Sequence, residues 1–77
     1  MIPQPDAEID ARDLLCPLPV LRARKRLMQM QSGQVLRIVT TDPMALIDLP
    51  HFCAEAGHLY LSAESDGRET AHRIARG

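Results

Sequence analysis

The sequence predicts a two-layer α/β fold with the element order β-α-β-α-β-β. The chain has 77 residues, enough for one domain with a thin core, because a domain of this size buries only roughly 60% of its unfolded surface. Apolar residues make up 45% of the chain, with one Tyr, one Phe and no Trp, so the core must consist of Leu, Val, Ile, Ala and Met. Segments of strand-like and helix-like periodicity alternate along the chain, as two packed layers require.

The first predicted strand spans 7–11 and turns Ile9 inward. Residues 1–6 precede it with two prolines and no periodicity, which predicts a loose leader. Arg12 and Asp13 form a turn after the strand, in which we expect Asp13 to adopt a left-handed conformation.

A first helix is predicted from Pro19 to Met30. Its apolar stripe, widened by the last two residues named here, consists of Val20, Ala23, Leu27, Met30, Leu21 and Met28. The other side carries Arg22, Lys25 and Arg26, while Arg24 falls within the apolar arc. This basic run is either an ordinary solvated helix face or a docking patch for an acidic partner.

A second strand follows over 34–41, with Leu36 and Ile38 on one face and Val35, Arg37 and Val39 on the other. Ser32 and Gly33 end the helix before it.

Asp42-Pro43 predicts the start of a second helix, with Asp42 as N-cap, which runs to Ala56 and ends at Gly57. At about 100° per residue, one face gathers Leu46, Leu49 and Cys53, flanked by Phe52, Ala56 and Pro50. The opposite, solvent side carries Met44, Asp48, His51 and Glu55. Pro50 predicts a kink or break near Asp48-Leu49.

The last two strands form a hairpin. Leu59, Leu61 and Ala63 alternate with Tyr60, Ser62 and Glu64 in the third strand. Ser65-Asp66-Gly67 is the turn, with Gly67 at positive φ, and a half-exposed fourth strand spans 68–75.

The stretch from Asp13 to Val20 places a thiol where a loop turns into a helix. Pro17 and Pro19 push the residues before them, Cys16 and Leu18, towards extended geometry, and Pro19 suits the first helical position. The helix start favours an anion, so we expect a lowered pKa for Cys16. The alternative is a small buried hydrophobe, but two prolines at this junction favour a rigidly held, reactive cysteine.

Charge and cysteine content exclude several classes of protein. The net charge is −1 and the pI about 6.2, which gives no overall bias towards nucleic acid or anionic membrane. No apolar run is long enough to span a membrane, and the N-terminus does not resemble a secretion signal, so a soluble cytoplasmic protein is expected. Cys16 and Cys53 are 37 positions apart, unlike a dithiol motif or a zinc knuckle, and Cys53 is expected in the core.

These residues resemble the TusA-like family of small sulfur-carrier proteins, which includes the SirA and YedF groups. The resemblance covers residues 9–64 most clearly. It comprises Asp10-Ala11, the run Leu14 to Leu21 around Cys16-Pro17-Leu18-Pro19, Arg24-Lys25, Met30 with Gly33, Thr41 to Ala45, Asp48 to Phe52, and Gly57-His58. Asp13 stands where the family usually has glycine, and Leu15 where some members carry arginine.

The resemblance implies a single domain over 1–77, with a mixed four-stranded sheet covered by two helices on one face. It implies that Cys16 accepts a sulfane sulfur as a persulfide and passes it on, with Asp13, Pro17, Leu18 and Pro19 shaping the site. The implied donor is a cysteine desulfurase or a rhodanese, and the acceptor belongs to tRNA thiolation, molybdenum-cofactor assembly or sulfur oxidation. No metal, nucleotide or organic cofactor is required, and a monomer suits serial docking.

Two other functions were weighed against this carrier. A nucleic-acid or regulatory binding module could use the basic face of the first helix, but the acidic pI and the scarcity of aromatic residues argue against it. A metal site would need His51, His58 and His72 with a cysteine, and their spacing matches no common ligand set. Surface or hydrogen-bonded histidines are therefore expected. Asp10, Asp42 and Asp48 are explained as strand end, helix cap and solvent face.

Overall fold

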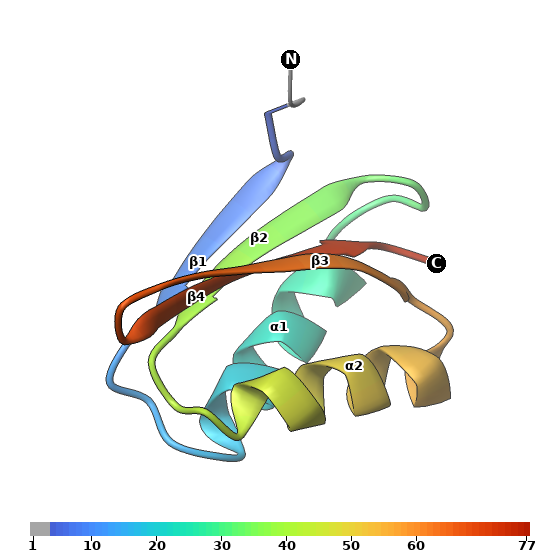
Figure 1. The fold of residues 1–77 in the computed structure, drawn as a ribbon. Coiled ribbons are helices and arrows are strands. Elements are labelled where there is room, and N and C mark those ends of the chain that lie inside the picture. The colour runs from blue at the N-terminus through green and yellow to red at the C-terminus, as the bar shows by residue number, and fades with distance from the viewer. Residues whose placement is uncertain (1–3) are drawn as a thin grey trace.

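A computed structural model describes residues 4–77 as a four-stranded sheet with two helices on one of its faces (Figure 1). The elements follow the predicted order: β1 (Ala7–Ala11), α1 (Leu18–Met28), β2 (Val35–Thr40), α2 (Ala45–Ala56), β3 (Leu59–Asp66) and β4 (Glu69–Ala75). The predicted two-layer sandwich is confirmed.

The sheet has the strand order β1-β2-β4-β3. β1 and β2 pair in parallel, and β4 lies antiparallel between β2 and β3. Each helix is the crossover that returns the chain to the start of a parallel strand, since β3 also runs in the direction of β2. Both helices therefore begin at the same end of the sheet, beyond the carboxyl ends of β1 and β2.

The core lies between the helices and the sheet. Leu36 and Ile38 of β2 are fully buried there, while Val35, Arg37 and Val39 on the opposite face are only partly buried, as the alternation predicts. The helices contribute the following buried residues: Pro19, Ala23 and Leu27 from α1, and Ala45, Leu49 and Cys53 from α2.

The helix boundaries differ from the prediction at three ends. α1 begins at Leu18 rather than Pro19, because the Leu18 N–H closes a turn onto the Leu15 carbonyl at 2.8 Å and the helix continues from it. It ends at Met28, two residues before the predicted end. Asp42 and Pro43 form a turn, in which the Ala45 N–H donates to the Asp42 carbonyl at 3.0 Å, and α2 proper starts at Ala45.

Pro50 does not break α2, which continues through it to Ala56. The residues on either side along the core face, Leu49 and Cys53, are 0% and 1% exposed, so their packing holds the two halves of the helix against the sheet.

Three leucine or methionine side chains expected in the core are instead exposed. Leu46 is 44%, Leu21 49% and Met28 73% exposed. In α2 the core face is the row Ala45, Leu49 and Cys53, which leaves Leu46 at its margin. The core face of α2 is thus rotated about the helix axis relative to the predicted one. For the same reason Asp48, which was expected on the solvent side, is half-buried.

β4 is more deeply buried than its polar sequence predicted, because Thr70, His72 and Ile74 all face the helices. His72 is fully buried and bonds on both sides, to Thr40 Oγ1 through Nε2 at 2.8 Å and to the Tyr60 hydroxyl through Nδ1 at 2.7 Å. These partners satisfy the ring and make its burial possible.

The predicted leader is tied to the sheet at its last residue. The Asp6 N–H donates to the Val35 carbonyl at 2.9 Å, and Asp6 Oδ2 accepts from the Val35 N–H at 2.7 Å. Residues 1–3 of the leader lie outside the described residues. Within 4–77, neither helix has the length and apolar character needed to cross a membrane.

Candidate functional site

Cys16 lies in the segment between β1 and α1. This segment is at the end of the molecule where both helices begin (Figure 1). Cys16 is exposed, as expected for a reactive cysteine and not for a core residue. The carboxyl ends of parallel strands are where α/β proteins commonly place their functional loops.

The turn that leads into this loop is fixed by Asp13. Asp13 has φ of 66°, the left-handed conformation predicted for it, and its N–H donates to Thr41 Oγ1 at 2.9 Å. The turn after β1 is thereby joined to the residue that follows β2.

Asp42 holds Cys16 itself. Its Oδ2 accepts the Cys16 backbone N–H at 2.8 Å, and its Oδ1 accepts the Met44 N–H at 3.0 Å. One side chain therefore bonds to the segment before α1 and to the segment before α2. These two bonds, the Cys16 one foremost, lower the pKa of the Asp42 carboxyl and keep it ionised. The predicted role of Asp42 as N-cap is wrong, because the N-cap of α2 is Met44 and no side chain caps this helix. Asp42 lies in the turn before the helix, where its side chain accepts the N–H groups of Met44 and Cys16.

The expected lowering of the Cys16 pKa is wrong. The pKa of the thiol is raised, first by its hydrogen bond to the Asp48 carboxylate, then by desolvation, and then by the negative charges of Asp48 and Asp42. The start of α1 offers little to oppose them, because Pro17 and Pro19 lack N–H groups and no side chain caps the helix. Sequence reasoning missed Asp48, whose spacing on a helical wheel assigned it to solvent.

Cys53 has a different environment. It is 1% exposed on the core face of α2, and burial raises the pKa of its thiol to about 11. The structure therefore separates the two cysteines into one accessible and one enclosed thiol.

Large apolar side chains are exposed in the segments that carry Cys16 and Asp42. Leu15 is 68%, Leu18 43% and Met44 45% exposed, and all three lie in the loops and first turns that carry Cys16 and Asp42. The predicted docking residues Arg22, Lys25 and Arg26 follow along α1 and line a shallow groove with Ile9 of β1 and Gln29. Arg24, expected within the apolar arc, is exposed.

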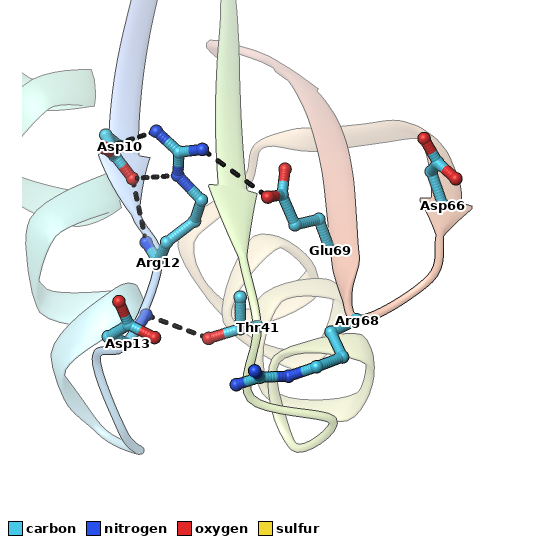
Figure 2. A pocket seen from close by; sticks show the side chains of 7 residues that line it. All are labelled: Asp10, Arg12, Asp13, Thr41, Asp66, Arg68 and Glu69. Carbon is cyan, nitrogen blue, oxygen red and sulfur yellow. Dashed lines mark hydrogen bonds and ion pairs between the residues drawn. The ribbon is translucent and has the colours of Figure 1, made fainter.

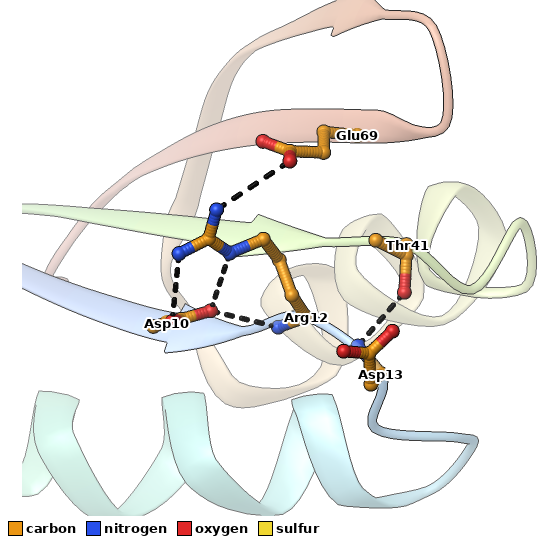
Figure 3. A network of polar contacts seen from close by, with 5 residues as sticks. All are labelled: Asp10, Arg12, Asp13, Thr41 and Glu69. Carbon is orange, nitrogen blue, oxygen red and sulfur yellow. Dashed lines mark hydrogen bonds and ion pairs between the residues drawn. The ribbon is translucent and has the colours of Figure 1, made fainter.

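An open groove lies at the same end of the sheet, but Cys16 does not line it. It is lined by Asp10, Arg12, Asp13, Thr41, Asp66, Arg68 and Glu69 (Figure 2). Arg12 occupies its middle and pairs with Asp10 at 2.9 Å and with Glu69 at 3.5 Å, reaching from β1 across β2 to β4 (Figure 3). The bond from Arg12 lowers the pKa of Asp10 to about 2. We read this network as a support for the turn that leads to Cys16.

The three histidines lie in separate places. His51 pairs with Glu55 on the exposed side of α2, His58 accepts the Gly77 N–H through Nδ1 at 3.0 Å, and His72 lies in the core. This matches the expectation of surface or hydrogen-bonded histidines.

A family model described as Sulfurtransferase TusA matches residues 7–76. The chain belongs to the TusA family. A curated sulfur carrier protein TusA from Allochromatium vinosum is 44% identical over 62 residues, which are 80% of this chain and 82% of that protein. A putative sulfur carrier protein from Neisseria meningitidis is 50% identical over 60 residues, 77% of this chain and 81% of that protein.

The fold comparison agrees with the TusA assignment. The crystal structure of a SirA-like protein from Desulfitobacterium hafniense superposes with a TM-score of 0.76 at 28% identity, over 92% of this chain and 97% of that one. Membership of the TusA family gives no support to the alternative of a nucleic-acid or regulatory module.

Proposed function

We propose that this TusA family protein is a sulfur carrier that receives sulfane sulfur as a persulfide on Cys16 and passes it to an acceptor protein. The observation that carries the proposal is the contrast between the two thiols: Cys16 is exposed at the rim where two helices begin, and Cys53 is enclosed in the core. Relatives described as a sulfur carrier protein and a putative sulfur carrier protein provide independent support.

The chemistry needs one accessible sulfur and a fixed backbone. Cys16 Sγ attacks the outer sulfur of a donor persulfide, the S–S bond breaks, and the donor cysteine leaves as a thiol. The Asp42 carboxylate holds the backbone of Cys16, and Asp13, Pro17, Leu18 and Pro19 shape the loop around it. A held sulfur loses little entropy when a partner docks, which favours transfer.

Docking combines the apolar rim with the basic residues of α1. Leu15, Leu18 and Met44 supply apolar contact area close to the sulfur. Arg22, Lys25 and Arg26 add a positive edge that attracts a partner with acidic residues and speeds encounter.

The donor that fits this chemistry is a cysteine desulfurase or a rhodanese, because each forms a protein-bound persulfide. The acceptor would lead to tRNA thiolation, molybdenum-cofactor assembly or sulfur oxidation. We expect the carrier to act as a monomer, since one face must bind donor and acceptor in turn. We also expect it to act in the cytoplasm, without direct nucleic-acid contact and without a cofactor.

Intact-mass spectrometry of single-cysteine variants tests the proposal. After incubation with cysteine and a cysteine desulfurase, the Cys53→Ala variant should gain about 32 Da, and dithiothreitol should remove it. The Cys16→Ser variant, which keeps Cys53, should gain nothing. Loading of the Cys16→Ser variant at the rate of the Cys53→Ala variant would contradict the assignment.

A further inference from the structure

Three consecutive residues at the end of β2, Thr40, Thr41 and Asp42, each form a side-chain hydrogen bond to a different part of the molecule. Thr41 Oγ1 accepts the Asp13 N–H at 2.9 Å (Figure 3). Asp42 Oδ2 accepts the Cys16 N–H at 2.8 Å. The segment between β1 and α1 is therefore held at its first turn and at the reactive cysteine by two neighbouring residues of one other segment.

Thr40 joins this group to the core. It is 1% exposed, and its Oγ1 bonds to His72 Nε2 at 2.8 Å. The other ring nitrogen of His72 bonds to the Tyr60 hydroxyl at 2.7 Å, so two hydrogen bonds connect β3 through β4 to the last residue of β2. The backbone of Thr40 also pairs with Ala11 on one side and with Thr70 on the other. Thr40 is therefore the last point of β2 that both the sheet and a buried side chain hold.

These buried polar groups fix direction more than they add stability. A hydrogen bond in the core mainly offsets the hydration that its two groups lose, so its net contribution to folding is small. It does restrict the side chains and backbone that it joins, because an unpaired buried partner would be costly. For sulfur transfer direction matters, since a displacement of about 1 Å at the reacting atom can cost roughly 10²-fold in rate.

We propose that Thr40 and Thr41 are positioning residues for sulfur transfer. Thr40, bonded to His72, fixes the end of β2, and Thr41 sets the turn at Asp13 from which the Cys16 segment starts. Both act through the backbone that carries the sulfur. This inference rests on the proposed carrier function.

The experiment compares a protein donor with a small donor, in a Cys53→Ala background that leaves one thiol. A cysteine desulfurase supplied with cysteine presents its persulfide from a docked protein, so transfer depends on the direction in which Cys16 Sγ points. Glutathione persulfide approaches freely, so its reaction depends on that direction much less. The mass gain of about 32 Da measures both reactions, and rising carrier concentration separates kcat from KM for the desulfurase.

The variants keep the shape of each threonine or keep its hydroxyl. Thr40→Val and Thr41→Val remove the hydroxyl but retain the β-branched side chain, whereas Thr40→Ser and Thr41→Ser retain the hydroxyl. Thr70→Val is the matched control, because it removes a threonine hydroxyl that bonds to Ser65 Oγ at 2.9 Å in the β3–β4 hairpin. Far-UV and near-UV circular dichroism check that each variant is folded.

We expect each valine variant at Thr40 and Thr41 to lower kcat with the desulfurase by about tenfold and to leave KM within about twofold, because the docking surface is unchanged. Their reaction with glutathione persulfide should stay within about twofold of the parent. The serine variants and Thr70→Val should match the parent with both donors.

Several results would overturn the inference and leave the carrier function standing. Parent kcat in both folded valine variants would remove the positioning role, and a loss in Thr41→Val alone would remove the role of Thr40. An equal loss in Thr70→Val would trace the effect to general stability, and an equal loss with glutathione persulfide would trace it to the reactivity of the thiol. A parent that takes no sulfur from either donor would overturn the carrier function together with the inference.

Discussion

The backbone N–H of Cys16 donates to Asp42 Oδ2 at 2.8 Å, across 26 positions of sequence. The bond joins the loop before α1 to the turn before α2, so the position of the reactive sulfur depends on a side chain that follows β2.

Replacement of Asp42 by alanine should loosen Cys16 without unfolding the sheet. The Cys16 amide loses an ionised acceptor, and we expect its hydrogen exchange to become roughly tenfold faster, measured by NMR on the native protein. Melting temperature should fall as well, because the Met44 N–H loses its partner. Asp66→Ala, in the β3–β4 hairpin, is the control and should leave this amide unchanged. Unchanged exchange in Asp42→Ala would show that the bond does not hold the loop.

The stability of the fold should depend on pH through His72. Burial lowers the pKa of His72 from 6.5 to about 4. The unfolded chain therefore binds a proton at higher pH than the folded one, so this stabilisation is complete above about pH 6.5 and is lost as pH falls through 4. The loss should approach about 3 kcal/mol near pH 4, measured by urea unfolding. His72→Gln should flatten this dependence, and an equally steep slope in that variant would assign it to other groups.

Asp13 has a left-handed backbone conformation, which costs free energy for any residue other than glycine. At φ of 66°, Asp13→Gly should be as stable as the parent or more stable by up to about 1 kcal/mol, whereas Asp13→Ala should lose about 1 kcal/mol. Chemical denaturation of the two variants measures both values. Loss of stability in Asp13→Gly as large as in Asp13→Ala would mean that the aspartate side chain stabilises the turn.

Charge reversal on α1 should slow the encounter with a donor. The triple variant Arg22→Glu, Lys25→Glu, Arg26→Glu should be loaded by a cysteine desulfurase about tenfold more slowly at low ionic strength. The difference should shrink at about 0.5 M salt because the charges are then screened. Arg68→Glu, on the hairpin, is the control. A salt-independent difference would point to lost packing, and equal rates would assign the basic face to solvent alone.

The element order and the inward faces of the strands could be predicted because they depend on local periodicity. Leu36 and Ile38 alternate with Val35, Arg37 and Val39 in the sequence as they do in β2. Asp13 and Gly67, at φ of 66° and 64°, were also identified correctly, since few residue types tolerate that conformation.

The environment of Cys16 could not be predicted in the same way. A helical wheel gives the face of α2 that meets the sheet, but it does not say which flank meets the neighbouring loop, and Asp48 lies on that flank. The direction of the Cys16 pKa shift was wrong for this reason: local reasoning saw a helix start, while two aspartates distant in sequence decide the charge around the sulfur. His72 was similarly hidden, because its partners Thr40 and Tyr60 come from two other strands.

The location of both helix starts at one end of the sheet has an evolutionary consequence. Leu15, Leu18 and Met44 are exposed and belong to connecting segments or first turns, whereas Leu27, Leu36 and Ile74 fill the interior elsewhere. Substitutions that adapt the protein to a new partner enzyme can therefore accumulate at this end of the sheet with little loss of folding stability. One fold can thus give rise to many carriers that differ in their partners.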